Sequence, residues 1–330
     1  MLALIDITAW HWAGFILCVI FFLALDLGVF HREAHVVQFK EALTWTTIWV
    51  LLSFGFGLLL APAAVTGWGQ PDSVEFVTGY IIELSLSMDN VFVIALIFAY
   101  FRVPSQYQHR WLFWGILGAL LMRGVLIGAG AALISRFMWT LYLFGVFLVF
   151  TGVRMLFASD DGVHPEKNIL LRLTKKFFPV AETFHGQKFA VYERGRFTLT
   201  PLALVLVVVE TTDLIFAVDS IPAIFAVTQK PFIVFTSNVF AILGLRSLYF
   251  VLAGAIDCFR YLKVGLSFVL VFIGMKMLLD PHQPEGVRMQ WFQVQISSSV
   301  SLLVVGAIIA TSIALSMVAG RRERRFGPKP

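Results

Sequence analysis

The sequence predicts an all-α polytopic membrane protein, a single membrane domain of about nine transmembrane helices with an inverted three-helix internal repeat. Three observations predict this class. Of the 330 residues, 59% are hydrophobic and only 14% are charged. Membrane-length apolar runs recur along the chain, and acidic, basic and glycine positions of one half recur in the other. Since a soluble domain averages about half apolar and a quarter charged residues, most of this chain must be solvated by lipid.

The apolar runs are about 17–25 residues long or slightly longer, enough to cross about 30 Å of hydrocarbon. The expected spans are 10–30, 43–61, 74–100, 112–134, 139–157, 198–227, 232–256, 264–280 and 292–319. The chain then divides into the first two helices (1–73), repeat 1 (74–157), a loop (158–197), repeat 2 (198–280), and the last helix with a basic tail (281–330).

Lysine and arginine residues gather in alternate connections, most densely in 158–197 and in the tail. The positive-inside rule places those connections in the cytoplasm of a bacterial-type inner (plasma) membrane, with the N-terminus outside and the C-terminus cytoplasmic. Residues 167–178 mix apolar and basic side chains, which predicts an amphipathic helix on the surface of the membrane or of the protein.

Composition excludes several partners. The net charge of +5 lies in short loops and forms no soluble basic patch, so we expect the lipid bilayer and no nucleic acid as partner. Cys18 and Cys258 are far apart, which argues against a disulfide framework or a thiol relay. The sequence identifies no protein partner.

The internal repeat is visible in two pairs of segments. ELSLSMDN (83–90) matches DLIFAVDS (213–220), and VFLVFTGVRML (146–156) matches SFVLVFIGMKML (267–278). Each copy covers three spans, so the second copy enters the membrane from the opposite face. Inverted repeats of this kind are typical of secondary transporters, whose substrate site lies between the repeats near mid-membrane. The alternative is chance similarity between apolar helices.

Carboxylates inside the spans are the candidate functional residues, because a charge in hydrocarbon is costly and persists where it has a role or a partner. The acids are Glu83, Asp89, Glu210, Asp213 and Asp219, with Asp26 near the inner end of the first span. Neutral oxygens beside them come from Asn90, Ser220 and Asn238. The alternative is that these acids are protonated or paired groups that only hold the bundle together.

Helical geometry constrains the sixth span. Glu210 and Asp219 would project from nearly opposite sides of a continuous helix, at about 100° per residue. Either several helices surround this one or the helix is broken, and Pro222 favours a break.

Several anionic oxygens suit a hard divalent cation such as manganese, magnesium or calcium. All seven histidines fall at span ends or in loops, which argues against zinc or copper. We therefore expect a transported cation and no tightly bound cofactor. Arg123 and Arg246 occupy matching repeat positions inside spans. Each either forms a fixed ion pair with an intramembrane acid or competes with the cation for the carboxylates.

Three segments resemble one known family over nearly the whole chain: ALDLGVFHREAHVVQFKEAL (24–43), ELSLSMDNVFVIALIF (83–98) and VVVETTDLIFAVDSIPAIFAVTQKPFIVFTSNVFAILGLRSLYF (207–250). They resemble the TerC family, most closely its Alx-like branch, within the LysE-type exporter superfamily. The resemblance implies manganese export and a historical link to tellurite resistance. It also implies that Asp89–Asn90 and Asp219–Ser220 are motif pairs near the transport pathway. Positions Glu83, Glu210, Asp213 and Asp26 match further motif acids.

The resulting hypothesis is an inner-membrane exporter of divalent manganese, not an enzyme, in which protons are the expected counter-ion. The choice of manganese over calcium or magnesium rests on the resemblance. One rival is an intramembrane hydrolase, but the sequence has no GxGD or HExxH segment. The other is an assembly factor that metallates secreted or membrane proteins or helps them to mature.

Overall fold

The structure is a computed structural model that describes residues 6–25, 38–157, 168–181, 183, 186, 188–193, 195–254, 261–280, 294 and 296–326. Within these residues the helices are α1 (Ala9–Leu25), α2 (Phe39–Gly55), a π-helical turn (Phe56–Leu60), α3 (Ala61–Ala64), α4 (Gln70–Tyr100), α5 (Ser105–Arg136), α6 (Thr140–Phe157), α7 (Ile169–Phe177), α8 (Pro201–Phe225), α9 (Pro231–Gly254), α10 (Leu262–Leu279) and α11 (Ser298–Phe326). Two strands, β1 (Ala190–Glu193) and β2 (Arg196–Leu199), pair antiparallel.

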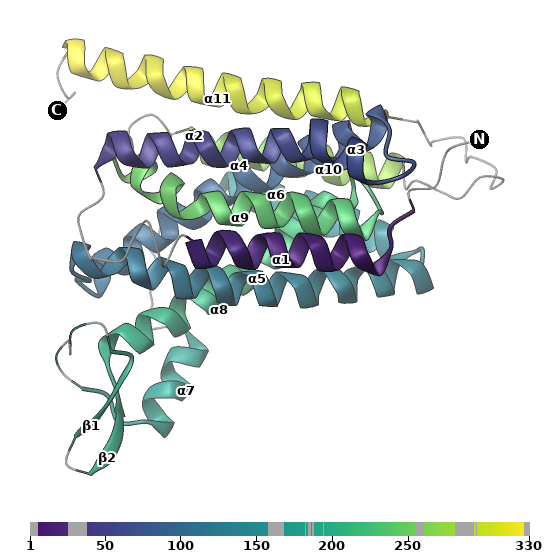
Figure 1. Ribbon diagram of the computed structural model, residues 1–330. Coiled ribbons are helices and arrows are strands. Elements are labelled where there is room, and N and C mark those ends of the chain that lie inside the picture. Colours follow the sequence, from purple (N-terminus) through teal and green to yellow (C-terminus); the bar gives the residue numbers. More distant parts are fainter. Residues whose placement is uncertain are drawn as a thin grey trace.

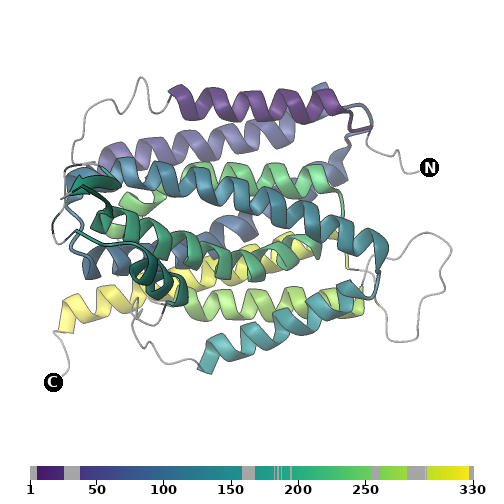
Figure 2. The ribbon, with the colours of Figure 1, turned by 90° about the horizontal axis from the view of Figure 1, so that it is seen from below.

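The long helices lie roughly side by side in one bundle, which confirms the all-α polytopic class (Figures 1 and 2). In the described part of the chain, eight helical segments are long and apolar enough to cross a membrane, and the shorter apolar helix α1 runs beside them. Large apolar side chains such as Leu51, Val125 and Leu303 are more than 60% exposed on the outside of the bundle. In a bilayer these side chains face lipid.

Several helices begin where the sequence favours a start. Pro201 and Pro231 are the first residues of α8 and α9, where the absent N–H is not needed. At α4, the Asp72 side chain accepts a hydrogen bond from the backbone N–H of Gly69 (2.7 Å). These local signals place the helix starts within a few residues of the expected spans.

Helix α9 lies in the interior of the bundle. In its most apolar stretch of 18 residues, 89% of the residues are buried. It packs against α2, α4 and α5, while α8 packs against α4, α5 and α6. Helix α8 is continuous through Pro222, so the expected break at this proline is wrong. Pro222 has no N–H, so α8 lacks one backbone hydrogen bond there, yet the helix continues to Phe225. Membrane helices tolerate such a proline where neighbouring helices pack around it. Surrounding helices, not a break, accommodate acids on several sides of α8.

Helices α6 and α10 are in direct backbone contact. A Cβ at Gly152 would lie 2.8 Å from the carbonyl oxygen of Ser267, and a Cβ at Gly274 would lie 2.8 Å from that of Gly145. Residue numbers rise on one helix as they fall on the other, so α6 and α10 are antiparallel. Gly152 and Gly274 are equivalent positions in the two aligned segments.

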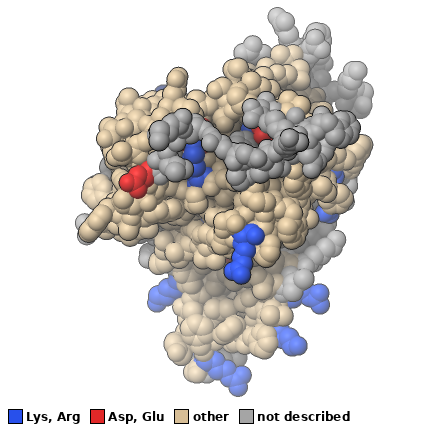
Figure 3. Space-filling view, turned by 90° about the vertical axis from the view of Figure 1, so that its right-hand side faces the viewer, with Lys and Arg blue, Asp and Glu red and all other residues tan. Residues whose placement is uncertain are grey.

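The loop between the two halves contains more structure than the sequence predicts. The amphipathic helix is present as α7, and the β1–β2 hairpin follows it. Together they form an extension that projects from the side of the bundle near one end (Figure 1). Figure 3 shows basic side chains gathered over this extension, at the bottom of the view.

Candidate functional site

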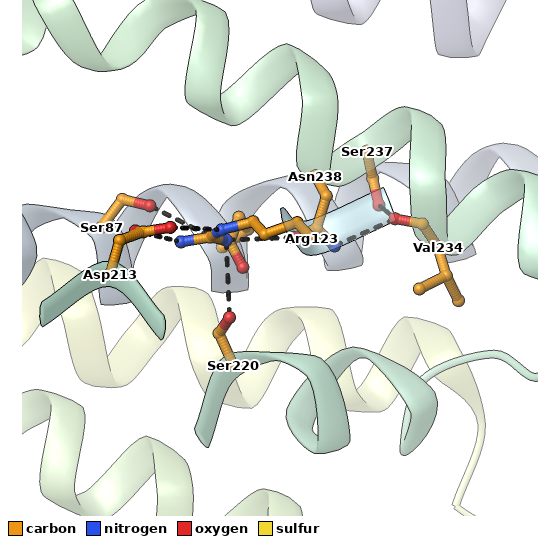
Figure 4. A network of polar contacts seen from close by, with 8 residues as sticks. Ser87, Arg123, Asp213, Ser220, Val234, Ser237 and Asn238 are labelled. Carbon is orange, nitrogen blue, oxygen red and sulfur yellow. Dashed lines mark hydrogen bonds and ion pairs between the residues drawn. The ribbon is translucent and has the colours of Figure 1, made fainter. Parts of the chain in front are cut away.

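Arg123 of α5 lies at the centre of a buried ion-paired cluster (Figure 4). Its side chain is 2% exposed. One Nη1 hydrogen is donated to Oε1 of Glu83 on α4. Nη2 and Nε face the two oxygens of Asp213 on α8, at 3.1 and 3.4 Å. Arg123 therefore forms ion pairs with two intramembrane acids, Glu83 and Asp213.

Neutral side chains complete this cluster. Arg123 Nη1 also donates to Oδ1 of Asn238 (3.1 Å) and more weakly to Oγ of Ser220 (3.5 Å). Ser87 Oγ donates to Glu83 Oε1 (3.1 Å). The second oxygen of Glu83, Oε2, is buried and has no hydrogen-bond partner among the described residues. A buried carboxylate oxygen without a partner is costly unless it holds a proton or a cation.

Glu210 lies beside this cluster, one helical turn before Asp213 on α8. Both acids line a small cavity of about 30 Å³ between α4, α5, α8 and α9, whose walls include Ile94, Ile116 and Leu245. A cavity of this size has room for a water molecule. The cavity therefore adjoins the Arg123 cluster through Asp213.

Asp219 faces a different neighbour. It is hydrogen-bonded to the side chain of Thr151 and lies near Arg154, both on α6. Asp219 is only partly buried, in contrast to Asp213. The structure thus separates two acids of α8 that the sequence grouped together.

The remaining predicted residues lie on α4, on α9 and outside the described part of the chain. Asp89 is partly buried and Asn90 is buried on α4, one to two turns beyond Glu83. Arg246 is partly buried on α9. Asp26 lies outside the described residues.

Among the residues that the structure describes, no three His, Cys, Asp or Glu side chains are grouped as metal ligands. In their place, the guanidinium of Arg123 lies between Glu83 and Asp213. In this arrangement a protein cation takes the position between the carboxylates. A metal ion could bind both acids only after Arg123 had moved away from at least one of them.

A second charged network lies where α4 begins and α8 ends. Lys230 Nζ is 2.5 Å from Asp72 and 3.0 Å from Glu75, and Thr228 donates to Glu75 (2.7 Å). Burial disfavours the charged amine, but the hydrogen bond with Asp72 and the charge of Glu75 outweigh it and raise the pKa of Lys230. Figure 3 faces this end of the bundle, whose described surface carries few charges.

Sequence reasoning missed these contacts. The signal for the second network was the pair of acids in the first two turns of α4, opposite a lone lysine in the short connection before α9. For Asp219, the available signal was Arg154, a cation that sits inside the second repeated segment of the first copy. Both signals can be recognised only when the facing helices are known.

Membrane-length helices around a buried, ion-paired cluster define a polytopic integral membrane protein with charged groups inside its bundle. The chain belongs to the integral membrane protein TerC family, which its residues 68–324 match.

Relatives extend over nearly the full length. The chain is 50% identical to "Uncharacterized membrane protein STKORF319" of Myxococcus xanthus, covering 94% of this chain and 92% of that protein. It is 43% identical to "Putative membrane-bound redox modulator Alx" of Escherichia coli K12, covering 96% and 97%. An uncharacterized membrane protein of Rickettsia bellii is 36% identical, covering 93% and 97%. No solved structure matches this chain. These matches confirm the resemblance to the Alx-like branch.

Proposed function

We propose that this protein exports a divalent metal cation, manganese above all, from the cytoplasm through its buried carboxylates. The observation that carries the proposal is the charge balance at Arg123. One guanidinium faces two carboxylates, those of Glu83 and Asp213, inside the bundle. When both acids are ionised, the cluster has one negative charge too many for a low-dielectric site. A cation or a proton relieves that imbalance, and Glu83 Oε2 is available to either.

The chemistry of the ligands supports a hard cation. Carboxylate, amide and hydroxyl oxygens, as in Asp213, Asn238 and Ser220, suit manganese, magnesium and calcium better than zinc or copper. The preference for manganese rests on the resemblance to the TerC family. Arg123 gives release a physical basis, because its guanidinium competes with the metal for the same oxygens. Protonation from the outer side weakens the hold of the acids on the metal, which is compatible with proton antiport.

The inverted repeat is part of this proposal. The antiparallel contact of α6 with α10, made through the equivalent residues Gly152 and Gly274, supports it. Equivalent helices that run in opposite directions are what an axis in the membrane plane requires. The Arg123 cluster takes one acid from each repeat, Glu83 and Asp213, as expected for a site between repeats.

A second candidate function is assembly or metallation of other proteins. The extension formed by α7 and the β1–β2 hairpin favours it, because it projects from the bundle and could contact a partner (Figure 1).

The relative named a redox modulator suggests a third possibility, a role in redox chemistry. The described part of this chain offers one cysteine to such a role, the exposed Cys18 of α1.

The test is manganese flux into inside-out vesicles that contain this protein, with calcium and magnesium as competitors. Asp213→Asn removes the carboxylate that accepts hydrogen bonds from two nitrogens of Arg123. Asp219→Asn removes the carboxylate that faces α6. We expect Asp213→Asn to abolish uptake and Asp219→Asn to reduce it strongly. Asp6→Asn, at an exposed acid before α1, is the matched control and should leave uptake unchanged.

Uptake no greater than in empty vesicles would overturn the exporter proposal. Co-purification of a protein partner that depends on residues 168–199, and not on Asp213, would then favour the assembly function. Uptake that persists in Asp213→Asn would show that the Arg123 cluster is not the metal site.

A further inference from the structure

Glu210 occupies a space that exists only because residue 118 is glycine. A Cβ added to Gly118 on α5 would overlap the carboxyl group of Glu210, lying 2.6 Å from its Oε2. Real Cβ atoms do not approach other heavy atoms this closely, so a side chain at position 118 would displace the carboxylate. Because the atom in the way is the end of a flexible side chain, the displacement would move Glu210 and leave both backbones in place.

The position of Glu210 matters because of what it borders. The carboxylate lines the same small cavity as Asp213, and the cavity walls are otherwise mostly apolar. Along α8 the order is Glu210 and then Asp213, starting from the helix end that the positive-inside rule assigns to the cytoplasm. A cation that enters from that end therefore meets Glu210 before it reaches the acids held by Arg123.

We infer that Gly118 is a positioning residue, which places Glu210 at the cavity as the first carboxylate to receive the divalent cation before Asp213 and Glu83. This inference rests on the proposed export of a divalent cation. Oxygen ligands bind such cations within about 2.0–2.6 Å, so a displaced carboxylate no longer fits the cation at this cavity. The role of Gly118 is to leave room for the carboxylate, and it contributes no ligand of its own.

The test compares Gly118→Ala with Gly128→Ala on the same helix, where a Cβ would meet nothing within 4 Å. Both substitutions add one methyl group and raise the helix propensity by the same amount. A difference in KM between the two variants therefore reports on the displacement of Glu210. We expect Gly118→Ala to raise the KM for manganese flux about 10–100-fold, the usual loss when a residue that orients a metal ligand is changed. We expect Vmax to change little, and Gly128→Ala to match the parent in both.

A rescue variant separates positioning from a general packing effect. Glu210→Asp is shorter by one methylene and has room beside an alanine, so Gly118→Ala with Glu210→Asp should have a lower KM than Gly118→Ala alone. In a Glu210→Gln background, Gly118→Ala should add no further loss, because the two changes act on one carboxylate. The inference would be overturned if Gly118→Ala and Gly128→Ala had the same KM. It would also be overturned if the increase in KM of the double variant with Glu210→Gln were the product of the increases of the two single variants.

A second readout keeps this result apart from the fate of the export proposal. The rate at which a carbodiimide modifies Glu210 in the purified protein, measured by mass spectrometry, does not require flux. If the parent protein moves no manganese, the export proposal fails and the cation-receiving role of Glu210 fails with it. If Glu210 is labelled at the same rate in Gly118→Ala and Gly128→Ala, Gly118 does not position Glu210. This conclusion holds whether or not the protein transports manganese.

Discussion

At the scale of single residues, Arg123 supplies the positive charge beside the buried carboxylates of Glu83 and Asp213. Replacing Arg123 by methionine keeps much of the side-chain volume but leaves Glu83 and Asp213 buried without their counter-charge. Breaking a buried pair in this way costs about 3–5 kcal/mol. We expect a large drop in the midpoint of thermal unfolding in detergent.

The matched control for Arg123 removes all the charges at once. The triple variant Arg123→Met, Glu83→Gln, Asp213→Asn has no buried ion left, and it should recover most of the lost stability. If Arg123→Met alone were as stable as the parent, Glu83 and Asp213 would have to be uncharged in the folded protein. The charge argument for a cation site would then no longer hold.

At the scale of helices, α6 and α10 approach each other so closely that their backbones touch. A Cβ at Gly274 would lie 2.8 Å from both the carbonyl oxygen of Gly145 and the backbone nitrogen of Val149. Backbone atoms cannot move aside as a side chain can, so we expect Gly274→Ala to push the helices apart and lower stability by about 1–3 kcal/mol. Gly306→Ala on α11, where a Cβ meets nothing within 4 Å, is the control and should be neutral or stabilising. Equal unfolding midpoints for the two variants, measured in the same detergent, would contradict the described contact.

At the scale of the whole molecule, the topology depends on α1. The eight longer segments alone would place both ends of the chain on the same side, and α1 as a ninth span places them on opposite sides. Helix α1 lies beside the bundle, and Trp12 and Phe15 contact the rings of Phe232 and Phe235 on α9. We expect reporters fused before residue 6 and after residue 326 to show an external N-terminus and a cytoplasmic C-terminus. Reporters on the same side would mean that α1 does not span the membrane.

The candidate site was only partly predictable. The sequence singled out Glu83, Asp213, Arg123, Ser220 and Asn238, and these five residues do meet in one cluster. It could not separate them from Glu210, which lines the adjoining cavity, or from Asp219, which faces α6. The reason is that a spacing in sequence gives an angle around one helix axis, and which neighbour occupies that angle depends on packing. The role of Gly118 was invisible for the same reason.

The sequence by itself determined the membrane class, the approximate bounds of the spans and the presence of buried charges. Each of these follows from local composition and length, because hydrocarbon imposes the same requirement on every crossing helix. Only the tertiary structure decided that α8 is continuous through Pro222, that α6 and α10 touch at their glycines, and that Arg123 joins Glu83 to Asp213. These features depend on the rotation and approach of whole helices. Contacts between residues far apart in the chain set that rotation and approach, and no local pattern encodes them.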